Sequence, residues 1–193
     1  MNFSRTKIAT LFSLSIIILN EVMAIETPKH TLVKKENGFE VREYDSMIIA
    51  TTNVSSDYSD AASTGFRRIA NYIFGGNSAG MSIEMTAPVL TNSPDPQDDY
   101  EIQFVMPSEF LMEDLPQPNS QNVTLKKVNL GRTAVLRFGG WATEERASKY
   151  KDKLRDLLAA NGYTPNGTFM VAQYNSPWAI PPFRKNEIIV QIK

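Results

Sequence analysis

The sequence contains no cysteine and a single histidine, His30, among its 193 residues. The lack of cysteine excludes disulfide bonds, thiolate metal sites and cysteine nucleophiles. One histidine excludes a metal site built from several histidines, and a Ser-His-Asp triad would have to use that one side chain. The sequence therefore predicts no metal site built from the protein's own residues and offers little support for an enzyme.

Neither sign of charge is in excess. Lys and Arg number 20 against 21 Asp and Glu, which gives a net charge of −1, and the basic residues are scattered along the chain. Nucleic-acid-binding proteins usually concentrate a basic surplus in one stripe, so no nucleic-acid partner is expected. The composition, with 42% hydrophobic residues, is that of an ordinary globular protein, and the length suits one well-packed domain.

Long apolar runs are also lacking, apart from one near the N-terminus. Residues 8–19 form a run of twelve apolar and small residues that follows Arg5 and Lys7 and precedes the small-x-small triplet Val22-Met23-Ala24. This pattern is typical of a signal peptide over residues 1–24, and the run is shorter than the ~20 residues of a membrane span. We expect an exported, periplasmic or secreted protein whose domain covers residues 25–193, with no stable membrane span after cleavage. The alternative is an uncleaved N-terminal anchor.

Beyond residue 24, strand-like and helix-like patterns alternate. Helices are predicted over residues 59–74 and 143–161, and Asn37–Gly38 indicates a hairpin turn. Strands are predicted over residues 30–36, 39–44, 47–54, 82–90, 100–106, 123–129, 132–138, 168–174 and 187–192. The order strand–helix–strand–strand appears twice, over 47–106 and 132–192. This repetition predicts an α+β fold in which two units share a curved or barrel-like sheet with the helices outside.

Several segments, in order along the whole of residues 25–193, together resemble the SOUL haem-binding family. They are IETP at 25–28, FEVREY at 39–44, GFRRIANYIFGGN at 65–77, MTAPV at 85–89, FVMPS at 104–108, and YNSPW at 174–178 leading into RKNE at 184–187. The resemblance implies a distorted β-barrel from two βαββ repeats, flanked by two helices. It also implies haem or another tetrapyrrole as a non-covalently bound cofactor or cargo, in a shallow apolar groove beside the first helix.

On that helix, the expected core stripe is Ala62, Phe66, Ile69 and Ile73. At 100° per residue, Ser63, Arg67, Ala70 and Phe74 fall together beside it. Small residues, an aromatic ring and a cation suit a flat porphyrin and one of its propionates. The predicted site on this helix is Ser63, Phe66, Arg67, Ala70, Asn71 and Phe74. The alternative is that Phe66 belongs to the core while Arg67 and Arg68 only solvate an exposed face.

The segment from Tyr174 to Lys185 is the densest aromatic, proline and basic stretch, and the predicted site includes its Tyr174, Trp178, Arg184 and Lys185. Such a loop can close over an apolar planar ligand, with a cation reaching a carboxylate. Alternatively, the loop is rigid and Trp178 caps the barrel. The glycine-rich residues 75–80 lack the Lys-Ser/Thr of a phosphate-binding loop and are interpreted as a helix stop. Met81 and Met85 flank them and are expected to fill the core rather than to ligate iron.

Axial ligation is where the chain departs from part of that family. Some members carry a histidine between the Arg and Tyr of the strand motif, where this chain has Glu43, and His30 lies on the preceding strand. We expect weak, reversible haem binding by a carrier or buffer, without strong axial ligation. The alternative is a hydrolase-type enzyme or an effector-binding module that acts on a small apolar ligand in the same groove, with Glu84 or Glu101 as a buried carboxylate of raised pKa.

Overall fold

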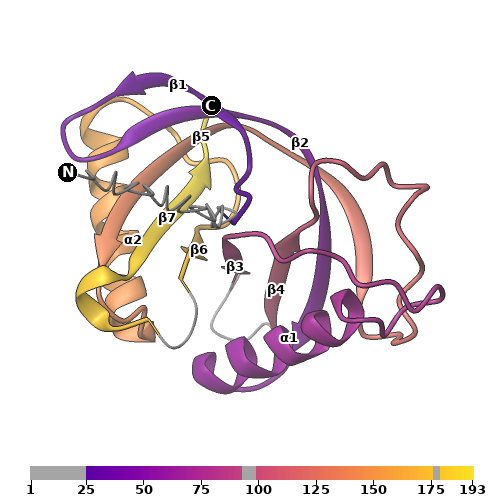
Figure 1. Cartoon of the computed structure of the whole chain (residues 1–193). Helices are drawn as coiled ribbons and strands as arrows, with labels where there is room; N and C mark the ends of the chain where they lie inside the picture. Colours follow the sequence, from indigo (N-terminus) through magenta and orange to yellow (C-terminus); the bar gives the residue numbers. More distant parts are fainter. Residues whose placement is uncertain (1–24, 93–98, 176–178) are drawn as a thin grey trace, which may run out of the picture.

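The computed structural model describes residues 25–92, 99–175 and 179–193 (Figure 1), and the predicted signal peptide lies outside them. These residues form strands, two α-helices and one 3-10 turn. The strands are β1 (His30–Lys35), β2 (Glu40–Val54), β3 (Val89–Asn92), β4 (Tyr100–Val105), β5 (Thr124–Gly139), β6 (Met170–Gln173) and β7 (Lys185–Gln191). The helices are α1 (Tyr58–Ile73) and α2 (Glu144–Ala160), and the turn is η1 (Pro181–Phe183).

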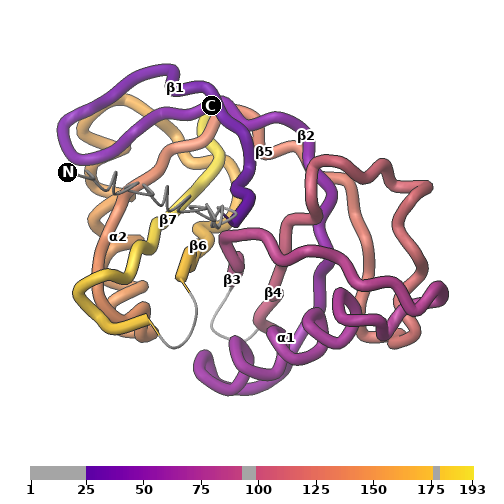
Figure 2. The backbone as a smooth tube through the Cα atoms, viewed as in Figure 1, coloured from indigo at the N-terminus to yellow at the C-terminus, as the bar shows by residue number. Residues whose placement is uncertain are grey.

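Six of the strands close into an antiparallel barrel. The order is β2-β4-β3-β6-β7-β5, β5 pairs back onto β2, and β1 adds to β2 outside the ring (Figure 2). Each repeat contributes its strands in the same first–third–second order, as β2-β4-β3 and as β5-β7-β6. The predicted α+β fold, a barrel of two βαββ repeats flanked by two helices, is confirmed, and residues 25–193 contain the whole of it.

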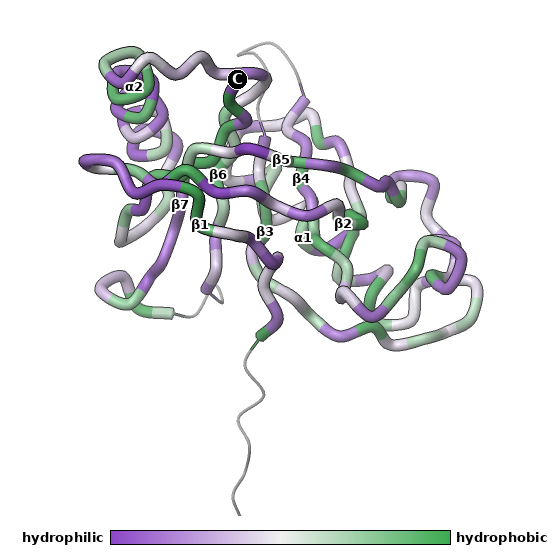
Figure 3. The backbone as a smooth tube through the Cα atoms, turned by 90° about the horizontal axis from the view of Figure 1, so that it is seen from above, coloured by the Kyte–Doolittle hydropathy of each residue, from purple (hydrophilic) through white to green (hydrophobic). Residues whose placement is uncertain are grey.

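Local sequence explains where the two helices begin. The Asp57 side chain accepts a hydrogen bond from the Asp60 backbone N–H at the start of α1, and Thr143 caps α2 in the same way. Helix α1 packs on β2 and β4, whereas α2 packs on β5 and β7. Apolar and polar residues alternate along α2 (Figure 3), and both helices bury one apolar face against the barrel wall.

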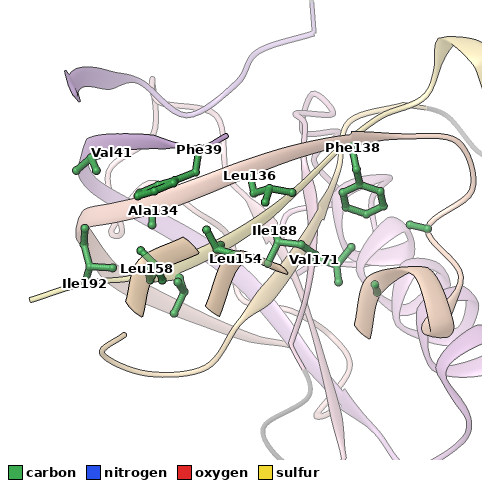
Figure 4. Close-up of a cluster of buried hydrophobic side chains, with 13 residues drawn as sticks. Phe39, Val41, Ala134, Leu136, Phe138, Leu154, Leu158, Val171, Ile188 and Ile192 are labelled. Atoms are coloured by element: carbon green, nitrogen blue, oxygen red, sulfur yellow. The ribbon is translucent and has the colours of Figure 1, made fainter. Parts of the chain in front are cut away.

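Three clusters of buried apolar side chains make up the core. One lies between α1 and the barrel and includes Ile69, Ile102 and Phe104. The second lies between α2 and the barrel, where Leu154 and Leu158 face the sheet (Figure 4). The third contains residues such as Ile49 and Ile189, which alternate along their strands with those under the helices and therefore point into the barrel. The outer wall and the interior are consequently separate environments.

Two pairs of predicted strands are single long strands in the structure. Residues 39–44 and 47–54 are joined in β2, and residues 123–129 and 132–138 are joined in β5. The two strands pair with each other from Glu40↔Val135 to Thr51↔Thr124, and the pairing continues across both gaps, with Tyr44↔Gly131 and Ser46↔Asn129. The strand predicted over 82–90 is wrong for most of its length, because β3 begins only at Val89.

The core stripe of α1 is also rotated from the one predicted. Its buried residues are Ala61, Gly65, Ile69, Tyr72 and Ile73, while Ala62 and Phe66 are half-buried. Gly65 explains the rotation, because a Cβ atom there would lie 2.5 Å from Cγ1 of Ile102. The helix therefore approaches β4 by its glycine. Within the described parts of the chain, no helix has the length and apolar character that a membrane span needs.

Candidate functional site

The outer face of α1 carries the first group of predicted site residues. Ser63, Arg67 and Asn71 are exposed, Ala70 is half-buried, and Phe74, which caps the helix, is 61% exposed. The Arg67 guanidinium donates a hydrogen bond to Oγ1 of Thr64 (3.0 Å). Because Thr64 is neutral, this hydrogen bond does not neutralise the positive charge of Arg67, which can still pair with an anionic group. This part of the site is therefore a polar helix face that ends in an accessible aromatic ring.

The two flanks of α1 point to different strands. Phe66 packs near Phe104 of β4 (ring centroids 5.7 Å apart) and contributes to the cluster that includes Val89. On the other flank, Arg68 donates to the backbone carbonyl of Asn53 on β2 (2.8 Å). Phe66 is thus partly a core residue, and Arg68 is tied to the barrel.

The glycine-rich segment after α1 is held by one buried amide. The side chain of Asn77 donates to the carbonyls of Tyr72 and Met81 and accepts from the N–H groups of Ala79 and Met81, at 2.7–3.2 Å. The prediction that residues 75–80 end the helix fits the structure, because Gly75 has φ +104° immediately after α1. Met81 packs against the α1 cluster as predicted, but Met85 is exposed and fills no core.

The loop before β7 holds the second group of predicted residues. Lys185 is exposed, and its Nζ lies 4.0 Å from the centre of the Tyr174 ring. Arg184 is buried; its guanidinium stacks over the Trp141 ring at 3.7 Å and donates to the carbonyl of Ala179. Trp178 lies outside the described residues. The structure thus brings Tyr174 and Lys185 together, but it places Arg184 against Trp141, a residue that sequence reasoning missed.

The two groups of predicted residues sit on different parts of the barrel. Helix α1 packs on β2 and β4, whereas η1 packs on β5. Trp141 gave no sequence signal beyond its position after Gly139–Gly140, and only the folded loop shows its contact with Arg184.

A charged cluster inside the barrel is the feature that sequence reasoning missed most clearly. Glu187 of β7 accepts hydrogen bonds from Arg42 of β2 (3.0 and 3.1 Å), from Nε of Arg137 on β5 (3.1 Å) and from the hydroxyl of Tyr174 (2.5 Å). The Glu187 side chain is 0% exposed. Arg42 also contacts Glu40 and donates to the hydroxyl of Tyr44. Both Arg42 and Glu187 fall in the segments that carry the family resemblance.

This cluster fixes the ionisation of its members. Burial opposes ionisation of Glu187, but hydrogen bonds from Arg42 and Tyr174 hold its pKa below the usual value. Burial and the neighbouring Glu187 carboxylate raise the pKa of Tyr174. The carboxylate of Glu187 is therefore ionised and neutralised by two guanidinium groups.

Glu101, one of the two carboxylates considered for catalysis, faces the opposite part of the barrel interior. It accepts hydrogen bonds from Thr51 (2.7 Å), Gln103 (2.9 Å) and Lys126 (3.1 Å). Burial would raise the pKa of Glu101, yet these donors lower it. The expectation of a raised pKa at Glu101 is wrong, because all three donors stabilise the charged form. Glu84 is solvent-exposed.

Close to Glu101, a small polar cavity opens between the diverging ends of β2 and β5. Its volume is about 230 Å³, and it is lined by Thr51, Thr52, Asn53, Gln121, Asn122, Thr124 and Lys126. This lining contains no aromatic side chain, so the cavity does not offer the apolar walls that a porphyrin ring needs.

His30 and Glu43, the residues considered for axial ligation, lie on β1 and β2. The His30 ring is 5.0 Å from the ring of Tyr44, whose side chain belongs to the interior cluster. His30 is exposed, because β1 lies outside the closed barrel, and its ring is on the same side of the sheet as Tyr44, the side opposite the helices. Glu43 alternates with Arg42 and Tyr44 and is exposed on the outer side.

Comparison with known proteins finds the same family that the sequence segments resemble. A family model described as SOUL heme-binding protein matches residues 25–191. The chain is 28% identical over 180 residues to heme-binding protein 2 of Mus musculus, covering 88% of this chain and 87% of the relative. It is also 28% identical over 165 residues to heme-binding protein 2 of Homo sapiens, with 80% of each chain covered.

Solved structures show similarity at the level of the fold. A crystal structure of a hydrolase from Listeria innocua matches with a TM-score of 0.58 at 12% identity, covering 83% of this chain and 94% of that one. The EcmrR C-terminal domain matches with a TM-score of 0.62 at 15% identity, covering 80% and 96%. At such low identity these structures support the architecture and carry no argument about activity.

Proposed function

The chain belongs to the SOUL heme-binding protein family, and from this membership we propose that it binds haem or a related tetrapyrrole without acting as an enzyme. The family assignment supports tetrapyrrole binding as the general activity. Where the ligand binds, how tightly it is held and what role the complex plays are our own inferences from the side chains.

The observation that carries the proposed site is the spacing of Arg67 and Phe74 on the outer face of α1. They are seven residues apart, which is about 10 Å along a helix, and at 100° per residue they share one face. A porphyrin ring that stacks on the exposed Phe74 would bring a propionate towards the Arg67 guanidinium. Ser63 and Ala70 have short side chains and would leave room for the flat ring between them.

The side chains fit a tetrapyrrole better than they fit tight iron ligation. The imidazole of His30 is on the side of the sheet opposite the helices, and Glu43 offers a carboxylate in place of an imidazole. The exposed thioether of Met85, in the segment that follows α1, is a soft potential ligand. A lone thioether is a weak axial ligand, and we propose that stacking and propionate pairing supply most of the affinity, which makes binding weak and reversible.

The loop before β7 contributes less in this proposal. Arg184 already stacks on Trp141 and donates to Ala179, so a propionate would have to displace these contacts. Lys185 and Tyr174 remain candidates for a second wall of the site, as does Asn71 on the edge of α1. Trp178 stays a prediction, since it lies outside the described residues.

A weak, reversible site suits a carrier or buffer in an exported protein. The predicted cleavage after Ala24 would leave the N-terminal contacts of the domain intact. Glu26 pairs with Thr86, its carbonyl accepts from the N–H of Ala87 (2.8 Å), and its side chain accepts from the N–H of Ser108 (3.0 Å). Sequencing the N-terminus of the protein from its native host tests this step. A chain that begins at Met1 would contradict both cleavage and export.

The side-chain chemistry disfavours the enzymatic alternative. Glu101 and Glu187 are held in their ionised forms by cations and hydroxyl groups, so neither is poised as a general acid. Glu84 is exposed to solvent and does not line the barrel interior.

Titration of residues 25–193 with hemin, followed by absorbance, tests the proposal. We expect a saturable Soret shift and competition by other porphyrins. If hemin produces no saturable shift and porphyrins do not compete, tetrapyrrole binding is wrong and the effector-binding alternative gains support.

A further inference from the structure

A cluster of apolar side chains is exposed beside the N-terminus of α2, away from the outer face of α1. Trp141 is 50% exposed, and Ile180 and Phe183, at the two ends of η1, are 58% and 74% exposed. Large apolar side chains that project together into solvent usually mark an interaction surface. We call these three residues the Trp141 surface.

Contacts within the fold hold the Trp141 surface together. The N–H of Phe183 donates to the carbonyl of Ile180 (3.1 Å), which fixes the turn that presents both side chains. The next residue, Arg184, stacks on the Trp141 ring at 3.7 Å, and η1 packs on β5 just before Trp141. The apolar side chains are therefore fixed to the end of the β5–β7 pair, and their exposure does not result from a loose loop.

Basic residues continue from this surface along α2. Arg146, Lys149 and Lys153 are exposed and, at 100° per residue, share one strip of the helix. The guanidinium of Arg146 donates to the carbonyl of Gly139 (2.8 Å), which places this end of the strip beside Trp141. Within the described residues, none of the three cations forms an ion pair with a carboxylate. Acidic residues, namely Glu145, Asp152 and Asp156, occupy the neighbouring strip.

From this combination we propose that the Trp141 surface docks onto an anionic lipid surface. Apolar side chains that include a tryptophan suit the headgroup region of a bilayer, and an adjacent basic strip suits negatively charged lipids. Ile180 and Phe183 insert, Trp141 lies at the level of the headgroups, and Arg146, Lys149 and Lys153 contact the lipid phosphates. The inference concerns peripheral attachment and is independent of tetrapyrrole binding on α1.

Sedimentation of residues 25–193 with lipid vesicles tests the proposal, because this segment contains the whole barrel and lacks the apolar run of residues 8–19. We expect binding to phosphatidylcholine vesicles with about one third phosphatidylglycerol, weaker binding to pure phosphatidylcholine, and loss of binding at high salt. The double variant Ile180→Ser/Phe183→Ser should bind about tenfold more weakly, because it removes two inserting side chains. Arg146→Glu/Lys149→Glu should weaken binding to the anionic vesicles alone.

Leu111 offers a matched control, because it is 61% exposed and lies on the connection between β4 and β5. Leu111→Ser should bind vesicles within about twofold of the unchanged protein. In a Trp178→Phe background, where Trp141 is the remaining tryptophan, anionic vesicles should shift its fluorescence to shorter wavelength.

Three results would overturn the proposal. Vesicle binding that is absent, or that Leu111→Ser weakens as much as Ile180→Ser/Phe183→Ser does, shows that the Trp141 surface is not a lipid contact. Self-association in analytical ultracentrifugation that disappears in Ile180→Ser/Phe183→Ser assigns the surface to a second copy of the chain. Loss of hemin binding in that variant assigns it to the tetrapyrrole.

Discussion

The barrel interior and the outer face of α1 both gather polar side chains, and they use them in opposite ways. Inside the barrel, Arg42 and Tyr174 both donate hydrogen bonds to Glu187, and the Arg42 and Glu187 side chains are buried from solvent. On α1, Arg67 donates to a neighbouring hydroxyl and lies seven residues before the exposed ring of Phe74. Buried polar groups that satisfy one another stabilise a fold, whereas exposed groups beside an apolar surface are available to a ligand. The comparison predicts that interior changes affect stability and α1 changes affect binding.

Removing the buried carboxylate should have the largest effect on stability. Glu187→Gln removes the fully buried one of the two carboxylates paired with Arg42 and leaves only the partly exposed Glu40. The free energy of unfolding should therefore fall by about 3 kcal/mol, the lower end of the range for a broken buried ion pair. Urea unfolding of residues 25–193 measures this. Glu145→Gln, at an exposed position on α2, is the control and should change stability by less than about 0.5 kcal/mol. A small effect of Glu187→Gln would mean that the interior cluster is not a structural element.

The Glu187 carboxylate should also make the free energy of unfolding depend on pH in the acid range. The pKa of Glu187 is lower in the folded protein than in the unfolded chain, so its contribution is fully present above the unfolded value of about 4.3. It is lost as the pH falls from there towards the folded pKa. Unfolding free energy measured at a series of pH values should decline below about pH 4.5, and more steeply for the unchanged protein than for Glu187→Gln. Parallel acid profiles would assign the decline to other groups.

Substitutions on the outer face of α1 should change the affinity for haem and not the stability of the fold. Arg67→Ala should weaken haem binding by about 1–3 kcal/mol, the scale of a lost charged hydrogen bond, and leave folding unchanged. Arg68→Ala is the matched control, since Arg68 is tied to Asn53 on the other flank. A porphyrin ester without free carboxylates should bind both forms alike. If Arg67→Ala and Arg68→Ala have the same hemin affinity, Arg67 does not belong to the site.

Glu101 belongs to the barrel interior but is less buried than Glu187, so its effect on stability should be smaller. Its carboxylate is inside the barrel but partly open to solvent, and Lys126 is half-exposed. Glu101→Gln should therefore cost only about 1 kcal/mol of stability, the scale of a hydrogen bond and a screened ion pair. Hemin affinity should stay the same. A loss of binding in this variant would move the ligand into the barrel and would contradict the comparison.

The smallest effect is expected at the histidine. His30 is on the side of the sheet opposite the helices, so His30→Ala should leave the haem spectrum and affinity nearly unchanged. Metal-free protoporphyrin should then bind within about tenfold of haem, a difference of at most about 1.4 kcal/mol. Absorbance titrations of both ligands measure this. A low-spin spectrum that collapses in His30→Ala would make His30 an iron ligand.

Much of the architecture could be predicted from the sequence, because it follows from local pattern. The hairpin at Asn37–Gly38, both helices and the repeated strand–helix–strand–strand order appear in the structure close to their expected positions. Of the site residues predicted on α1, Ser63, Arg67, Asn71 and Phe74 are exposed, whereas Phe66 packs partly into the core. The predicted buried face of α1 differs from the observed one by about one residue. Gly65 faces the barrel, and only its contact with Ile102 shows this.

What the sequence alone determined is therefore the identity and order of the elements and the family to which the chain belongs. Tertiary structure decided the rest. The sequence predicts separate strands on either side of Asp45 and Ser46, yet pairing with β5 joins them into one strand. Arg42 and Glu187 are 145 positions apart, and closure of the barrel makes them partners. Periodicity reports which face of a segment is apolar, whereas strand pairing and buried ion pairs depend on contacts between distant segments that no local pattern encodes.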